Sequence, residues 1–206
     1  MIDLYTGNTS NGQRAAIILE ECGIPYRVRK YDLFKGEHRK DPEFMAHAPA
    51  GAIPVLVDPD GPGGKPLTLS QSCAILLYIA QKAGKFLPAD PVTRIAAFEW
   101  LMQAASDVAA RSAGVFFNAA LVPDKSEANG KWYVERTLKS FRDCDRRLAG
   151  RDYLADEVSV ADFALYPVYA ARKDLIDEAG DLRNLTAWGT RMLARGGVQR
   201  GMKAAA

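Results

Sequence analysis

Two short polar segments hold the side chains best suited to chemistry. Thr9-Ser10-Asn11 stands just before a run typical of a helix, and Gln71-Ser72 opens a second helical run. Hydroxyl and amide groups at a helix start donate hydrogen bonds, and the unpaired backbone N–H groups there attract an anion. The same residue types are also the commonest helix caps, so a purely structural role is the alternative for both segments.

The elements around the first segment alternate between strand and helix. Ile2–Tyr5 predicts a short strand, and Gln13–Cys22 predicts a helix that ends at Gly23. The residues 26–31 alternate in polarity and predict a second strand, and a short helix is expected near 42–45. A strand–helix–strand order predicts a parallel pair joined by a helical crossover.

The second segment follows a predicted hairpin. Pro54 has no N–H to donate, which suits the first residue of a strand. The residues 58–64 are rich in glycine and proline and predict a turn, after which 66–69 predict the returning strand. A nearly continuous apolar run after Ser72 then predicts a buried helix.

The second half of the chain predicts helices and no convincing strand. A glycine and two prolines within 83–91 indicate a boundary, which gives a first domain at 1–83, a linker at 84–91 and a helical domain at 92–206. Ser159 and Asp162 have the spacing of a capping box at a helix start. Other helical regions are expected at 94–121, 125–149 and 184–193, the last of them ended by Gly196-Gly197.

Composition excludes several classes of protein. The 206 residues are 48% hydrophobic and 25% charged, with a net charge of +2 and no long basic run, which argues against a nucleic-acid binder. No apolar run approaches a membrane span, and the N-terminus does not resemble a signal peptide. Three scattered cysteines favour a reducing, cytoplasmic location. His38 and His47 have no nearby cysteine or paired carboxylates, so no metal site is expected.

A strand opened by Ile53-Pro54, a hairpin return and Ser70-Gln71-Ser72 at a helix start resemble the glutathione-binding half of the cytosolic glutathione transferases. The resemblance covers nearly the whole chain and is strongest over 4–87. It implies an α/β thioredoxin-like N-terminal domain, an all-α C-terminal domain, glutathione as co-substrate and a homodimer. Thr9-x-Asn11-Gly12 is similar to the bacterial nu class, which is linked to glutathione-dependent disulfide reduction.

The resemblance implies roles for the first segment and for the hairpin. These enzymes lower the pKa of the glutathione thiol, because only the thiolate attacks well. Asn11 and Thr9 would supply the hydrogen bonds to the sulfur, with Ser10 as the reserve candidate. The Ile53–Pro54 bond would be cis, which would leave the Ile53 backbone free to pair with the cysteinyl part of glutathione. Tyr5 lies within a strand and is expected to pack rather than to donate.

The remaining parts of glutathione have candidate partners as well. The γ-glutamyl ammonium suits the Gln71 side chain, and its carboxylate suits Ser72. Many relatives have lysine where this chain has Ala52, so His38 is the candidate partner of the glycine carboxylate. Cys73 is expected to be buried, with a redox thiol as the alternative.

The second half departs from the nu class. Residues 111–118 lack the Gly-Gln-x-x-x-Phe-like segment of those relatives, and a second substrate is expected near Met102, Phe116 and Phe117. Arg136 falls near an arginine that in this branch reaches the glutathione of the partner subunit. The alternative for Arg136 is an ordinary solvated helix residue.

The expected function is therefore a glutathione-dependent transferase or disulfide reductase that acts on a small electrophile or disulfide. A zeta-like isomerase is an alternative suggested by Ser70-Gln71-Ser72, although the Ser-Ser-Cys of that class is absent from the first loop. A non-catalytic binding protein is the other alternative, because Ala52 and Gln71 would both weaken the hold on glutathione.

Overall fold

The structure is a computed structural model that describes all 206 residues, and it divides into two compact units. The first unit contains residues 1–85 together with 193–206, and the second contains 86–192. The sequence placed the whole of 92–206 in a helical domain. The structure differs from that prediction at the C-terminal end, which groups with the first unit.

The first unit is built on a four-stranded sheet in the order β2-β1-β3-β4. β1 pairs with β2 in parallel, while β1–β3 and β3–β4 are antiparallel. The strands are β1 (Ile2–Thr6), β2 (Tyr26–Lys30), β3 (Val55–Asp58) and β4 (Leu67–Ser70). This confirms the predicted thioredoxin-like arrangement.

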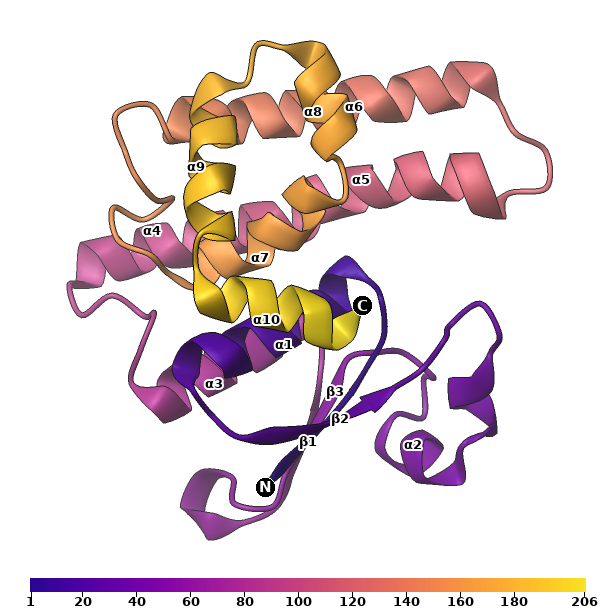
Figure 1. Cartoon of the computed structure of the whole chain (residues 1–206), viewed down its shortest axis with the longest axis vertical. Helices are drawn as coiled ribbons and strands as arrows, with labels where there is room; N and C mark the ends of the chain where they lie inside the picture. Colours follow the sequence, from indigo (N-terminus) through magenta and orange to yellow (C-terminus); the bar gives the residue numbers. More distant parts are fainter. The chain divides into compact units, whose positions relative to one another are not determined.

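Helices cover the sheet of the first unit. They are α1 (Ser10–Cys22), α2 (Pro42–His47), α3 (Ser72–Ala83) and α10 (Gly196–Ala205), with short 3-10 turns η1 (Glu37–Lys40) and η2 (Pro62–Gly64). α1 packs against both α3 and α10 (Figure 1). Phe44 of α2 packs on Tyr5 and Val55 of the sheet. Strand side chains alternate between faces, so the face of β1 that bears Tyr5 is the one that α2 covers.

The helix α10 corrects one sequence prediction. Gly196-Gly197 was expected to end the last helix, but α10 begins at Gly196. A Cβ atom at Gly197 would lie 2.8 Å from the Glu21 side chain, and one at Gly201 would lie 2.4 Å from Ile17 Cα. Gly197 and Gly201 therefore allow α10 to pack closely on α1. Gly196-Gly197 stands at the start of α10 and does not end a helix.

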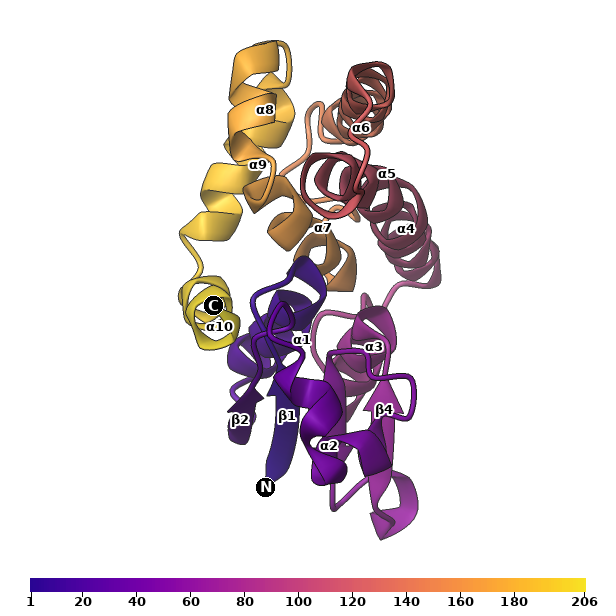
Figure 2. The same ribbon diagram turned by 90° about the vertical axis from the view of Figure 1, so that its right-hand side faces the viewer.

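The second unit is helical, and its only extended pairing is an isolated bridge between Ala155 and Glu157. The π-helical turns η3 and η4 interrupt the long helical path that begins with α4. The sequence did not predict α8. α5 and α6 lie side by side (Figure 2). The elements are α4 (Pro91–Met102), η3 (Gln103–Val108), α5 (Ala109–Phe116), η4 (Phe117–Leu121), α6 (Glu127–Arg147), α7 (Val160–Ala170), α8 (Lys173–Ala179) and α9 (Arg183–Leu193), which ends at the boundary between the units.

The predicted capping box begins α7. Ser159 Oγ accepts a hydrogen bond from the N–H of Ala161 at 3.3 Å, and Asp162 Oδ2 accepts one from the N–H of Ser159 at 2.9 Å. Asp162 Oδ1 also accepts hydrogen bonds from Trp188 Nε1 at 2.8 Å and from the N–H of Leu154 at 3.1 Å. Complete burial raises the pKa of Asp162 to about 6 despite these donors, because desolvation penalises the charged form.

No helix combines the length and the apolar character that crossing a membrane requires. No group of three or more His, Cys, Asp or Glu side chains is arranged to hold a metal ion.

Candidate functional site

A cavity of about 370 Å³ in the first unit brings four predicted site residues together. It is lined by Thr9, Asn11, Leu33, His38, Arg39, Gly51, Ala52 and Ile53. The predicted residues among these come from the start of α1, from η1 and from the residue before Pro54. Segments far apart in the sequence thus meet at one wall, which is the arrangement expected for binding an extended small molecule.

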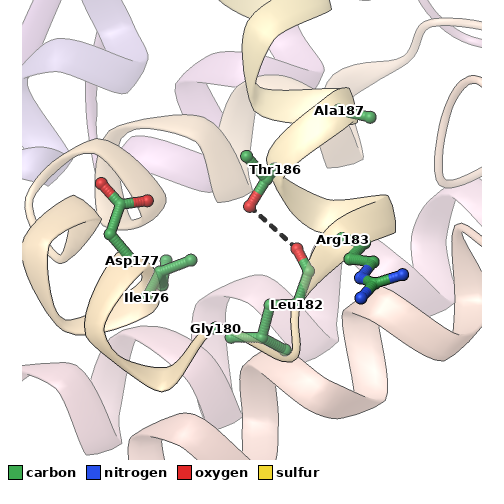
Figure 3. Close-up of a pocket in the computed structure, with 7 residues that line it drawn as sticks. All are labelled: Ile176, Asp177, Gly180, Leu182, Arg183, Thr186 and Ala187. Carbon is green, nitrogen blue, oxygen red and sulfur yellow. Dashed lines mark hydrogen bonds between the residues drawn. The ribbon is translucent and has the colours of Figure 1, made fainter.

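A second depression of about 400 Å³ lies between α8 and α9 and contains none of the predicted residues (Figure 3). Two of its three polar side chains, those of Thr186 and Asp177, already have partners. Thr186 Oγ1 donates to the carbonyl of Leu182 at 2.8 Å, and Asp177 pairs with Lys173. The first cavity is therefore the better candidate for a functional site.

Thr9 caps the helix α1. Its backbone is extended, with a φ of −139°, and its Oγ1 accepts a hydrogen bond from the N–H of Gly12 at 3.0 Å. A hydroxyl has one proton to donate as well as lone pairs to accept with. The cap therefore uses the acceptor and leaves the donor available to a molecule in the cavity.

Asn11 connects the two polar segments that the sequence singled out. Its Oδ1 accepts a hydrogen bond from Arg14 Nη1 at 2.8 Å and another from Ser72 Oγ at 3.2 Å. Arg14 Nη1 also lies 3.4 Å from Ser72 Oγ. The starts of α1 and α3 are thus joined by one hydrogen-bond network.

Arg14 is a residue of this network that sequence reasoning missed. Its exposed fraction is 2%, and burial lowers its pKa from the ordinary arginine value. An arginine on a helix is usually taken as a solvated residue. The apolar run Ala15–Leu19 directly after it is fully buried, and that run is the signal that could have indicated an enclosed arginine.

The Ile53–Pro54 peptide bond is cis, as predicted. β3 begins only at Val55, and no backbone hydrogen bond within the chain uses the N–H or the carbonyl of Ile53. Both groups are therefore available to a partner in the cavity that Ile53 lines.

Gln71 has an unusual backbone conformation at the start of α3. Its φ of 73° and ψ of 111° lie in a region that residues with a side chain rarely adopt. Such a conformation costs on the order of 1–3 kcal/mol and is typically kept at binding sites. Its side chain is exposed, and Ser72 after it is buried and begins the helix. Cys73 is half-buried and not fully buried as predicted.

His38 and Arg39 supply nitrogen atoms at the wall where Ala52 lacks a charge. His38 is 5% exposed, its ring meets Tyr31 and Phe44 edge-on, and its Nδ1 has no hydrogen-bond partner. The Arg39 side chain lies beside Gly51, where a Cβ atom would be 3.4 Å from Arg39 Nε. Gly51 has a φ of 63°, a left-handed conformation that favours glycine. The sequence predicted His38 but not Arg39.

Tyr5 packs in the sheet, as expected. Its hydroxyl donates to Glu43 Oε1 at 2.7 Å. Burial and this carboxylate raise the pKa of Tyr5 to about 12, so the phenol is committed elsewhere. Burial likewise raises the pKa of Cys22 to about 11 and that of Cys144 to about 12, which keeps both as unreactive thiols.

The lining of the cavity does not include five of the predicted site residues, which are Ser10, Pro54, Gln71, Ser72 and Arg136. Ser10 is the first residue of α1 and is half-buried. Arg136 is exposed on α6 of the second unit, where its guanidinium carbon lies 5.2 Å from the centre of the Trp132 ring. The role predicted for Arg136 needs a partner subunit and stays a prediction.

Known proteins resemble this chain over nearly all of its length. Residues 10–82 match the family model for the N-terminal domain of glutathione S-transferases. The disulfide-bond oxidoreductase YfcG of Escherichia coli is 37% identical over 183 residues, which cover 87% of this chain and 84% of that protein.

Solved structures agree with the sequence comparison. A glutathione transferase of Pseudomonas putida, crystallised with glutathione disulfide, superposes with a TM-score of 0.89 at 31% identity, covering 98% of this chain and 90% of the other. A family member of Pseudomonas fluorescens with two bound glutathione molecules gives a TM-score of 0.88 at 30% identity, covering 98% of this chain and 92% of the other. The chain belongs to the glutathione transferase family. Within it, the similarity to YfcG supports the nu-class resemblance of Thr9-x-Asn11-Gly12.

Proposed function

We propose that this protein binds glutathione in the cavity of the first unit and uses the glutathione thiolate to reduce small disulfides. The network that joins Asn11 to Ser72 supports this proposal most directly, since it connects a donor for the sulfur with a helix start suited to a carboxylate. The identity to a protein named as a disulfide-bond oxidoreductase favours reduction over conjugation.

The cavity, together with the start of α3 that Ser72 joins to Asn11, offers a partner for each part of glutathione. The cysteinyl backbone pairs with the free N–H and carbonyl of Ile53. The γ-glutamyl carboxylate lies at Ser72 and the start of α3, and the ammonium meets the Gln71 side chain. The glycine carboxylate is bound by His38 and Arg39, which line the wall where relatives have lysine instead of Ala52.

The thiolate is stabilised at the start of α1. The Asn11 amide and the Thr9 hydroxyl donate hydrogen bonds to the sulfur, and the positive end of the helix dipole favours its negative charge. A free thiol titrates at about 8.5, so lowering its pKa increases the fraction that can attack at neutral pH.

The electrons come from two glutathione molecules. The bound thiolate attacks one sulfur of the disulfide, forms a new S–S bond and releases the other sulfur as a thiolate, which takes up a proton. A second glutathione thiolate then attacks the glutathione sulfur of this mixed disulfide, releasing the second thiol and glutathione disulfide. No cysteine of the chain is oxidised in this scheme, which suits the buried Cys22 and Cys144.

We also propose a homodimer in the cytoplasm. Val92 and Ile95 on α4 are 77% and 66% exposed, which is typical of apolar side chains that a second copy covers. In such a dimer Arg136 reaches the glutathione of the partner subunit. The three unpaired cysteines suit a reducing compartment. Light scattering of the wild-type protein and of Ile95→Glu tests the dimer, since the charged residue should shift the mass toward a monomer.

The decisive experiment combines a glutathione titration with two turnover assays. We expect glutathione-dependent reduction of a small mixed disulfide to be fast and conjugation of an aryl halide to be slow. Binding without turnover in either assay would overturn disulfide reduction and favour another reaction, including the isomerase alternative. Neither binding nor turnover would favour a non-catalytic protein that keeps the fold.

A further inference from the structure

We propose that Arg14 is a positioning residue of the thiol site, whose buried guanidinium fixes the Asn11 amide with its oxygen inward and its NH₂ group toward the glutathione sulfur. The inference rests on the proposed function, and it assigns a role to a residue that does not line the cavity itself.

The orientation of Asn11 follows from what its neighbours can donate. A guanidinium has N–H donors and no acceptor, so the atom of Asn11 that lies 2.8 Å from Arg14 Nη1 must be the oxygen. Ser72 Oγ donates to the same oxygen at 3.2 Å. The two N–H donors of Asn11 therefore point away from this network.

The N–H donors of Asn11 point toward the cavity, where the glutathione sulfur would lie. Asn11 is exposed and lines the cavity, while Arg14 is 2% exposed. An amide has nearly the same shape in its two orientations, but the flipped one would turn a carbonyl oxygen toward the sulfur. That oxygen would repel a thiolate, whereas the N–H donors stabilise it.

The burial of Arg14 holds its contact with Asn11 in place. The Arg14 guanidinium is enclosed at the start of α1, so it cannot follow Asn11 if the amide turns. A hydrogen bond from a charged donor is also about twice as strong as a neutral one, and it polarises the amide that accepts it. The Asn11 N–H groups become better donors as a result.

The test measures the pKa of the glutathione thiol in the complex, from the ultraviolet absorbance of the thiolate as pH is varied. We expect Arg14→Met to raise this pKa by about one unit, which is a tenfold decrease in the acid dissociation constant of the bound thiol. Arg14→Lys keeps a charged group that only donates, so the pKa should stay near that of the wild-type complex. Arg200→Met is the matched control. Arg200 lies on α10, is exposed and pairs with Glu20 of α1, the helix that also carries Arg14.

A wild-type pKa in the Arg14→Met complex would overturn the proposal, and so would an equal rise in Arg14→Lys. If Arg14→Met does not fold, Asn11→Asp replaces it. This variant keeps an oxygen for Arg14 and replaces the outward N–H donors with an acceptor, so it should raise the thiol pKa at least as much. A pKa equal to that of the wild-type complex would then overturn the proposal.

A measurement without glutathione separates this inference from the proposed function. If the wild-type protein does not bind glutathione or lower its thiol pKa, the proposed function fails. The Asn11 side-chain NH₂ signal in nuclear magnetic resonance of the free protein still reports its contact with Arg14. That signal should move in Arg14→Met and keep its position in Arg14→Lys and Arg200→Met. A signal unmoved in Arg14→Met would refute the Arg14 contact.

Discussion

Two helix starts in this protein hold a side-chain oxygen that several donors share. At α7, Asp162 accepts from Trp188 Nε1 and from backbone and hydroxyl donors, and it is completely buried. At α1, Asn11 accepts from Arg14 and Ser72 but is exposed. The two clusters use similar contacts in different surroundings.

The two clusters differ in the hydrogen-bonding groups that have no partner within the chain. Every donor around Asp162 belongs to the chain, and the side chains of Ser159, Asp162 and Trp188 are fully buried, so this cluster serves the fold. Asn11 satisfies its oxygen within the chain, and it lines a cavity that its N–H groups could reach under the proposed function. Burial and the remaining donors, more than residue type, therefore distinguish the helix start that serves the fold from the one for which we propose a binding role.

The largest expected effect comes from Asp162→Ala. Removing the carboxylate leaves several buried donors without an acceptor, which should lower the free energy of unfolding by about 3 kcal/mol. Chemical denaturation measures the loss. The folded fraction should still lower the thiol pKa of glutathione as the wild-type protein does, and a raised pKa would show that the two clusters do not have separate roles.

Asn11→Ala should affect the cluster at the start of α1, and it should change activity more than stability. Loss of a hydrogen-bond donor to the attacking sulfur should reduce kcat/KM for disulfide reduction roughly 100-fold. Water can reach this exposed site, so the free energy of unfolding should fall less than in Asp162→Ala. Unchanged turnover would remove Asn11 from the chemistry and leave it as a helix residue.

The clusters should also differ in their response to pH. The pKa of Asp162 is raised to about 6, so its protonated form is favoured in the folded state. The contribution of protonated Asp162 to the free energy of unfolding is fully present below the unfolded pKa of about 3.9. This contribution is lost as pH rises through about 6. Unfolding curves of wild type and Asp162→Asn between these values isolate the effect, because the asparagine does not titrate. A constant difference between the two proteins across this range would contradict the assignment.

The smallest expected effect is at Gln71. Gln71→Glu gives the γ-glutamyl ammonium a carboxylate partner at an exposed site, which should strengthen glutathione binding by about 0.5 kcal/mol, or roughly twofold in Kd. Gln71→Gly is the matched control, since glycine accepts the φ of 73° but offers no side chain. It should weaken binding while it stabilises the fold. Equal affinity of all three proteins in calorimetry would remove Gln71 from the site.

Local signals explain how much of this structure the sequence could predict. The turn after β3 and the Ser159–Asp162 spacing each have one dominant local meaning, and they predicted the hairpin and the capping box. The order of strands and helices along the chain also followed from the residues, whereas the cis bond before Pro54 followed only from the family resemblance. The helix α10 was missed because Gly196-Gly197 has two meanings, and only the contact with α1 decides between them.

The candidate site shows the same limit. Thr9, Asn11, His38 and Ile53 were predicted, and the structure places them around one cavity. Arg14 was not, because the burial of a helix arginine depends on contacts across 58 residues of sequence, such as that with Ser72. Helix propensity depends on a residue and its neighbours along the chain. It does not predict which distant side chains will bury that residue.

The position of α10 has a consequence for the order in which the chain can fold on the ribosome. Glu21 of α1 accepts a hydrogen bond from the N–H of Val198, 177 residues later. The residues 86–192 must therefore leave the ribosome before the first unit can close, and until then the side of α1 that meets Gly201 stays uncovered. Helical units fold quickly from local contacts, so the second unit can be complete while the first still waits for its last helix.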